Sequence, residues 1–311
     1  MNKLFCFGYG YTAHHLSRAL AARGDFTIAG TTRDHDKLDV MAQHGIDAHL
    51  FSYDQAMPNP QALFRDVTHV LISVPPDDNG DPVWIFHGDD LARAPNLKWV
   101  GYLSSTAVYG DRGGDWVDEQ TDVHPVTKRG MRRSRAERQW LTLYQDHDFP
   151  AMIFRLAGIY GPGRSALETV RAGAARRINK QGHAFSRVHI DDIVQTLIAS
   201  MTRGKKGRVY NVADDYPAPS HEVIAYTCEL LGLPVPPLLD FNSADLAPIT
   251  MSFYTENKRV RNDLIKDELG VRLQYPTFRE GLLACRTALE QGDVPGDIPS
   301  YWFTEGRESL G

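Results

Sequence analysis

The chain starts with an apolar strand that breaks into a glycine turn and continues as a helix: Leu4-Phe5-Cys6-Phe7-Gly8-Tyr9-Gly10-Tyr11-Thr12-Ala13. Its two glycines and small Ala13 have the spacing of a dinucleotide-binding turn. Gly8 permits a tight turn, Gly10 lets a pyrophosphate approach the backbone, and the first amides of the helix face the anion. An ordinary strand-to-helix turn is the alternative. We predict a cofactor site here that includes Gly8, Gly10, Tyr11 and Thr12.

Apolar runs that resemble buried parallel strands recur along the chain, with helical patterns between most of them. Strands are expected at 3–7, 26–31, 47–51, 69–72, 99–103, 150–155 and 209–212. Helices are expected at 12–23, 36–44, 82–93, 128–146, 167–175, 190–201, 220–231 and 277–289. This alternation predicts an α/β fold built on a doubly wound parallel sheet.

After Arg155 the strands thin out and prolines cluster, which predicts a smaller substrate lobe made of loops and helices. We assign 1–160 to a dinucleotide-binding core, to which 185–215 returns through the run at 208–212. Residues 161–184 and 216–311 then form the substrate lobe and C-terminal tail. In that tail, Tyr301-Trp302-Phe303 is expected to be a docked strap rather than a partner contact.

Composition favours a small-molecule substrate. The 311 residues carry a net charge of -5, which gives no bias toward nucleic acid or anionic membranes. Cys6, Cys228 and Cys285 are scattered and the twelve histidines lack ligand spacing, so no disulfide framework and no metal site is expected. No apolar run reaches membrane-spanning length and no signal peptide is recognisable. We expect a cytoplasmic protein, in which helices 82–93 and 128–146 could pair in a homodimer.

The end of the second expected strand, Thr31-Thr32-Arg33-Asp34, bears on cofactor choice. NAD-selective folds place an acidic residue there to bind the ribose. Thr31 occupies that position, and Arg33 offers a forked cation suited to a 2′-phosphate, so we predict NADP rather than NAD. The alternative is that Asp34 serves as a shifted acid and Arg33 is solvated. Ser73 and Val74, after the fourth strand, are predicted to line the cofactor groove.

Three further segments carry a family resemblance: Leu103-Ser104-Ser105-Thr106-Ala107-Val108-Tyr109-Gly110, Phe154-Arg155-Leu156-Ala157-Gly158-Ile159-Tyr160-Gly161-Pro162-Gly163 and Val188-His189-Ile190-Asp191-Asp192-Ile193. In this order, after the glycine turn, they resemble the extended short-chain dehydrogenase/reductase superfamily, its NAD-dependent epimerase/dehydratase group. The resemblance runs from residue 1 to about 290. It implies a Rossmann-type core, a nicotinamide cofactor and a C-terminal lobe that in relatives often receives a nucleotide sugar or another small carbonyl compound.

The resemblance places the catalytic Ser or Thr at Ser105, whose hydroxyl could polarise a substrate carbonyl, and Ser104 beside the cofactor. A run of Ser-Ser-Thr after a strand is also typical of turn caps. Tyr109 is expected to pack in the core with a bonded hydroxyl. His189-Ile190-Asp191-Asp192 is interpreted as a helix entry capped by Asp191 or Asp192.

The family's Tyr-x-x-x-Lys signature is missing from the expected helix. If Glu137 matches the acidic residue that often follows the Lys, Arg129 and Arg133 hold the Tyr and Lys positions; a shift of two residues puts Met131 and Arg135 there. Arginine cannot exchange protons near neutrality. It can still hold the ribose or an anionic substrate group, so Arg129 and Arg133 remain candidate catalytic-site residues, and the resemblance narrows to an atypical branch.

One Tyr-x-x-x-Lys occurs downstream, at Tyr254-Thr255-Glu256-Asn257-Lys258, and we interpret it as coincidence because it follows all the core strands. His183 is an alternative acid/base only if folding brings it to the nicotinamide. The glycine-rich loop at 110–119 is either a mobile lid or a plain surface loop.

The sequence therefore supports two hypotheses. The first is an NADP(H)-dependent oxidoreductase or epimerase that exchanges hydride with a small carbonyl or sugar-like substrate and uses a non-standard acid/base. The second is a catalytically silent protein that senses NADP(H) or regulates a partner.

Overall fold

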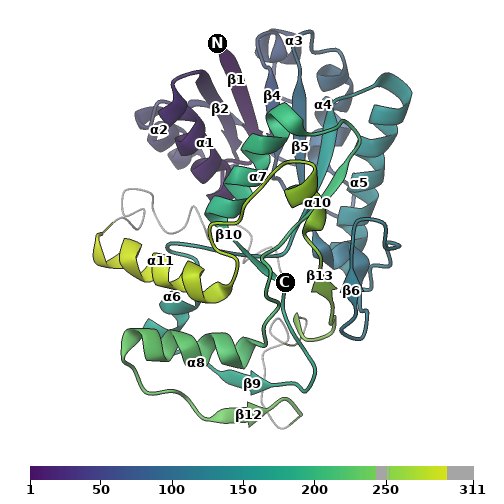
Figure 1. The fold of residues 1–311 in the computed structure, drawn as a ribbon. Helices are drawn as coiled ribbons and strands as arrows, with labels where there is room; N and C mark the ends of the chain where they lie inside the picture. Colours follow the sequence, from purple (N-terminus) through teal and green to yellow (C-terminus); the bar gives the residue numbers. More distant parts are fainter. Residues whose placement is uncertain (243–250, 252, 293–311) are drawn as a thin grey trace.

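A seven-stranded parallel sheet forms the centre of the computed structural model, which describes residues 1–242, 251 and 253–292 (Figure 1). The strand order is β11-β7-β5-β4-β1-β2-β3. From β1 the chain first adds β2 and β3 on one side and then adds β4, β5, β7 and β11 on the other, so the order of the strands switches between β1 and β4. The strands are β1 Asn2–Phe7, β2 Phe26–Thr32, β3 Asp47–Leu50, β4 His69–Ile72, β5 Trp99–Ser105, β7 Ala151–Leu156 and β11 Val209–Val212. The predicted Rossmann-type sheet is confirmed, including the return of the run at 208–212.

Helices cover both faces of the sheet, which explains why its strands read as continuous apolar runs. In β1, Leu4 and Cys6 belong to one core cluster, whereas Phe5 and Phe7 belong to the other. The first face carries α1 Tyr11–Arg23, α2 His35–Gln43 and α7 Ile190–Arg203; the second carries α3 Pro60–Phe64, α4 Pro82–Ala92 and α5 Lys128–His147. The sheet is therefore doubly wound.

The lobe lies below the sheet in Figure 1, on the side where the parallel strands end. It contains α6 Ala166–Arg171, β9 Arg177–Asn179, α8 Ser220–Leu231, β12 Leu238–Asp240 and α11 Phe278–Glu290, while β8 Gly158–Tyr160 and β10 Arg187–His189 connect it to the main core cluster, which includes Val188. Strand β10 pairs with β8, and β12 pairs with β9. Tyr160, Leu167, Val223 and Phe278 form a small core of their own.

Some short elements differ from the sequence-based expectations. Helix α6 ends at Arg171 rather than near 175, because Gly173 turns the chain with φ at 67°. Strand β6 (Trp116–Val117) pairs with β13 (Arg259–Val260), and α10 (Asp263–Asp267) follows; none of the three was predicted. Val260 and Ile265 lie in the main core cluster, so this part of 216–311 packs on the core rather than in the lobe.

Residues 301–303, the expected strap, lie outside the described residues. Among the helices of the described part, none combines the length and apolar character that crossing a bilayer requires.

A buried ion pair connects the helix and strands that flank the sheet's carboxyl edge. The side chains of Glu137 and Arg155 are 3% and 6% exposed, and Arg155 Nη2 lies 2.8 Å from Glu137 Oε2. Ser104 Oγ donates to Glu137, and Arg155 donates to the Tyr109 hydroxyl at 2.9 Å. Tyr109 in turn donates to Asn211 Oδ1 at 2.8 Å. The expected packing role of Tyr109, with a bonded hydroxyl, matches this arrangement.

Replacing Glu137 by Gln leaves the Arg155 charge buried without its counter-ion, so we expect the free energy of unfolding to fall by about 3 kcal/mol or more. Urea denaturation followed by circular dichroism measures this. The control is Lys206→Met, which removes an ion pair to Asp148 that is exposed on both sides and should cost less than about 1 kcal/mol. Equal stability of the two variants would contradict the role given to the buried pair.

Candidate cofactor and active site

The glycine turn is locked between the ends of β2 and β4. Gly8 adopts a φ of 82°, and its N–H donates to Thr31 Oγ1 at 2.8 Å. Tyr9 N donates to Thr31 O at 2.8 Å, and Ser73 Oγ donates to Gly8 O. A Cβ on Gly8 would come within 3.0 Å of Val74 Cγ2. Gly8 is therefore required by conformation and by close packing, and Thr31, Ser73 and Val74 shape the turn.

Gly10 differs from Gly8 because a Cβ placed on it would meet no atom within 4 Å. Helix α1 begins directly after Gly10 without a side-chain cap. Open space beside a helix start of this kind fits a pyrophosphate group. Tyr11 is buried and its hydroxyl donates to Pro162 O at 3.0 Å, and Thr12 is buried too. These two residues would therefore offer backbone amides rather than side chains.

The end of β2 places Arg33 at the surface, with its guanidinium 5.3 Å from the ring centroid of Tyr53. Thr31 is buried and engaged by the glycine turn. Asp34 accepts a hydrogen bond from Asp36 N at 2.9 Å and caps α2. This cap role disfavours the alternative in which Asp34 binds the ribose, and it leaves Arg33 as the charged group beyond the strand.

Ser104 and Ser105 face different surroundings. Ser104 is buried and donates to Glu137, so its side chain belongs to the buried network and the expectation of a cofactor contact is not supported. Ser105 is half-buried, and its Oγ accepts from Ala107 N at 3.2 Å, capping the 3-10 helix η1 (Thr106–Tyr109). Because Oγ acts as an acceptor in this bond, its hydrogen can be donated to a substrate carbonyl. The cap role therefore leaves the hydroxyl hydrogen of Ser105 available for a further bond.

Helix α5 carries Arg129, Arg133 and Glu137 on one face, since residues four apart on a helix are neighbours. Arg133 Nη1 donates to the Tyr102 hydroxyl at 3.2 Å and to Leu103 O at 2.5 Å, next to Ser104 and Ser105 in the chain.

Met131, Arg135 and Arg129 are all exposed, whereas Arg133 is half-buried against β5, so it is the position of Arg133 that favours the register matching Arg129 and Arg133 to the Tyr and Lys positions. Arg129 stacks its guanidinium over Phe253, 5.5 Å from the ring centroid.

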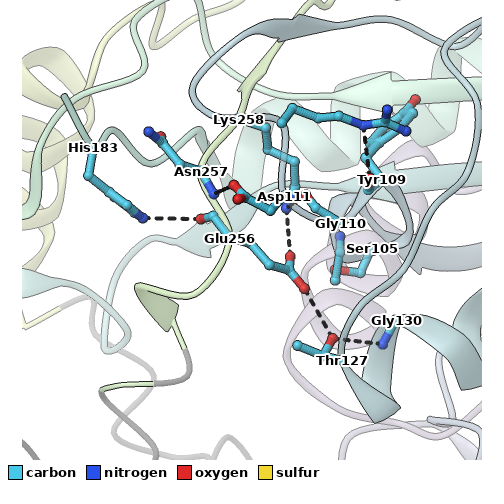
Figure 2. A network of polar contacts seen from close by, with 12 residues as sticks. Ser105, Tyr109, Gly110, Asp111, Thr127, Gly130, His183, Glu256, Asn257 and Lys258 are labelled. Atoms are coloured by element: carbon cyan, nitrogen blue, oxygen red, sulfur yellow. Dashed lines mark hydrogen bonds and ion pairs between the residues drawn. The ribbon is translucent and has the colours of Figure 1, made fainter.

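Two residues that the sequence analysis set aside reach this region (Figure 2). Lys258 Nζ donates to Gly110 O at 3.0 Å and lies 2.6 Å from Glu256 Oε2. Thr127, the cap of α5, donates to Glu256 Oε1 at 3.1 Å. Burial lowers the pKa of Lys258, although Glu256 opposes the shift. Tyr254 is not part of this group, because it packs in an aromatic cluster and no helix relates it to Lys258.

The loop at 110–119 is anchored rather than free. Asn257 O accepts from Arg112 N at 2.9 Å and from Gly114 N at 3.0 Å, and β6 pairs with β13. Asn211 N donates to Glu119 at 2.7 Å. The structure therefore does not support the interpretation of this loop as a mobile lid.

Comparisons with known proteins show which family and fold the chain resembles. The model of the NAD dependent epimerase/dehydratase family matches residues 90–213. The dTDP-D-glucose 4,6-dehydratase of Bos taurus is 23% identical over 159 residues, which are 48% of this chain and 39% of that protein. The Homo sapiens enzyme of the same name is also 23% identical, over 40% of its length. The chain thus matches about two fifths of the length of these curated relatives.

Among solved structures, a functionally unknown conserved protein from Silicibacter pomeroyi DSS is 50% identical, with a TM-score of 0.84 over 93% of this chain and 100% of that one. The chain belongs to the extended short-chain dehydrogenase/reductase superfamily. Two more distant members share its fold. A Bacillus anthracis dTDP-glucose 4,6-dehydratase in complex with NAD is 16% identical with a TM-score of 0.75, and both chains are fully covered. A Bacillus cereus UDP-glucuronic acid 4-epimerase in complex with NAD is 15% identical with a TM-score of 0.71, covering 93% and 99%.

In this superfamily member, His189 itself caps α7. Its Nδ1 accepts from Asp191 N at 3.3 Å, which corrects the expectation that Asp191 or Asp192 does so. Asp192 accepts instead from the backbone N–H groups of Gln274 and Tyr275, at 2.7 and 3.1 Å.

His183 lies next to the site and is 3% exposed. Its Nε2 is 3.1 Å from Glu256 O, and burial, reinforced by Lys180 and Lys258 and opposed by Asp111, lowers its pKa to about 4. A histidine with that pKa is neutral near pH 7 and has no proton to lose as an acid there.

Because His183 titrates near pH 6.5 in the unfolded chain and near 4 when folded, its contribution to stability is complete above pH 6.5 and is lost as the pH falls toward 4. We expect the wild type to lose about 2 kcal/mol relative to His183→Phe between pH 8 and pH 5. Urea denaturation of both proteins at pH 8, 6 and 5 measures the difference. A difference that stays constant over this range would count against a buried neutral His183.

Proposed function

We propose that the chain is an NADP(H)-binding oxidoreductase or epimerase that acts by hydride exchange on a small carbonyl or sugar-like substrate. The observation that carries this proposal is the glycine turn, which lies on the same sheet edge as Ser105. Protein atoms crowd the Cβ position of Gly8, whereas the Cβ position of Gly10 faces open space. When bound, a nicotinamide supplies or takes the hydride. The amides that begin α1 hold its phosphates, and Ser105 donates to the substrate carbonyl.

The more distant members support the class of cofactor and substrate. Both were solved in complex with NAD, and a further Bacillus cereus UDP-glucuronic acid 4-epimerase structure contains UDP-glucuronic acid and NAD. We choose NADP(H) for this chain because Arg33 offers the forked cation at the end of β2 and Asp34 serves as a helix cap. Arg129 and Arg133 favour a substrate with an anionic group, received between the core and the lobe.

The two glycines allow a matched test of the cofactor turn. Gly10→Ala should leave the free energy of unfolding within about 0.5 kcal/mol of wild type, because the methyl group meets no protein atom. It should weaken NADPH binding at least about tenfold by occupying the approach of the pyrophosphate. Gly8→Ala should instead destabilise the fold by about 1–2 kcal/mol, since the positive φ persists. Calorimetric titration and urea denaturation measure both; undiminished NADPH binding by Gly10→Ala would remove the turn from the site.

The choice of dinucleotide is tested by titrating NADPH, NADP⁺, NADH and NAD⁺ calorimetrically. We expect NADPH to bind the wild type more tightly than NADH, and Arg33→Ala to weaken NADPH binding about tenfold while leaving NADH unchanged. Arg65→Ala, which removes an exposed arginine after α3, is the control. A wild type that prefers NADH would refute the assignment of NADP(H).

A second candidate function is favoured by the arginines at positions 129 and 133, which replace the usual acid/base pair. It is a catalytically silent protein that senses NADP(H). Consumption of NADPH with a panel of nucleotide sugars and simple carbonyl compounds, including 9,10-phenanthrenequinone, separates the two candidates. Turnover with any member of the panel supports the enzyme, whereas NADPH binding without any turnover supports the sensor.

A further inference from the structure

The segment at 256–258 is fixed against the site by its middle residue. Asn257 N donates to Asp111 Oδ1 at 2.8 Å, and Asn257 O accepts from the loop at 112–114. The Asn257 side chain accepts from Ala184 N at 3.3 Å and donates to Gly182 O at 3.1 Å. Backbone and side chain are thus both held, so the positions of Glu256 and Lys258 on either side are determined by the fold.

Glu256 and Lys258 connect the end of the 3-10 helix η1 with the start of helix α5 (Figure 2). Lys258 reaches Gly110 O, at the end of the short helix that Ser105 caps, and Glu256 accepts from Thr127, the cap of α5. Glu256 also lies close enough to Arg129 to favour its charge. The pair therefore stands beside the position where the superfamily's tyrosine would be.

The surroundings of this pair suit proton transfer. Each side chain is only 10% exposed, so the ammonium group is largely removed from water without being sealed off. Among the described residues, Gly110 O and Glu256 Oε2 use two of its three N–H bonds, which leaves one for a substrate oxygen. Unlike the arginines on α5, a lysine can give up a proton, and burial lowers the pKa of Lys258 from its ordinary value although Glu256 opposes the shift.

We propose that Lys258 is the proton donor of this site and that Glu256 positions and recharges it; this rests on the proposed hydride-exchange function. As the carbonyl carbon gains hydride and the C=O π pair moves to oxygen, that oxygen takes a proton from Lys258 Nζ. Lys258 keeps the N–H bonding pair as a neutral amine, and a proton from solvent, passed by way of Glu256, restores the ammonium. Ser105 donates a hydrogen bond to the same oxygen.

The test compares three variants with the wild type, using NADPH and 9,10-phenanthrenequinone. Lys258→Met should lower kcat about 100-fold with the dissociation constant of NADPH changed less than about threefold. Lys258→Arg should be slow as well, because arginine keeps the charge and cannot give up its proton. Glu256→Gln should move the fall of kcat at high pH to lower pH, because the carboxylate favours the charged lysine.

Lys180→Met is the matched control, because Lys180 donates to a backbone carbonyl just before this segment, Tyr254 O. It should retain wild-type kcat and pH dependence. If Lys180→Met and Lys258→Met lower kcat equally, the lysine only clamps the segment, and the proposal fails. If Lys258→Met or Lys258→Arg reduces the quinone at the wild-type rate, the proposal also fails while the proposed function stands.

A second measurement needs no turnover. In ¹³Cε-lysine NMR of the protein without cofactor, the signal that disappears in Lys258→Met should titrate below the ordinary lysine value of about 10.4. A midpoint at or above that value would overturn the proposal. A wild type that binds NADPH but reduces nothing in the panel would overturn both the proposal and the enzymatic function, whereas one that binds no dinucleotide would refute the cofactor site itself.

Discussion

The ion pair between Glu137 and Arg155 determines how the elements around the site are placed. Burying two charges is favourable only where geometry and hydrogen bonds compensate for lost hydration. Here Arg155 contacts both carboxylate oxygens of Glu137, and hydroxyl groups from Ser104 and Tyr109 complete the network. Because these groups come from α5, β7, β5 and η1, any displacement of one element would leave a buried charge or hydroxyl unpaired. The network therefore fixes the rotation of α5 against the sheet.

That rotation has a direct chemical consequence. With Glu137 held under the sheet edge, the side chains one and two turns earlier lie on the same side of α5: Arg133 is half-buried against β5, and Arg129 is exposed and contacts Phe253. Arg133 bonds Tyr102 and Leu103 O, so it reinforces β5 next to Ser105. An arginine side chain can attract an anion but is a poor proton donor, so Arg129 and Arg133 suit α5 to binding an anion rather than to moving a proton.

The parts of the fold that the sequence predicted are those where one local pattern has one structural solution. Strands covered on both faces are apolar at their buried positions, as in β1 at Leu4–Phe7, and a glycine with positive φ follows the first of them. Ser104 and Ser105 were harder, because adjacent strand residues point to opposite faces and identical side chains give no sign of which is inward. The His189 cap was missed because the usual helix caps are Asp, Asn, Ser and Thr. His189 can take this role because the unprotonated nitrogen of a neutral imidazole accepts a hydrogen bond.

The position of Glu256 and Lys258 next to the site could not be predicted from the sequence, because it depends on contacts between distant segments. Their approach to the site depends on β13 pairing with β6 and on Asn257 bonding the loop at 112–114, contacts between segments more than a hundred residues apart. A strand of two residues is too short to show the alternating pattern from which such pairing could be predicted. The local motif is misleading as well, since Tyr254 and Lys258 match the family spacing without sharing a helix. The fold thus brings a lysine and a glutamate from 256–258 against Gly110 and Thr127, next to the helix that carries arginines at 129 and 133.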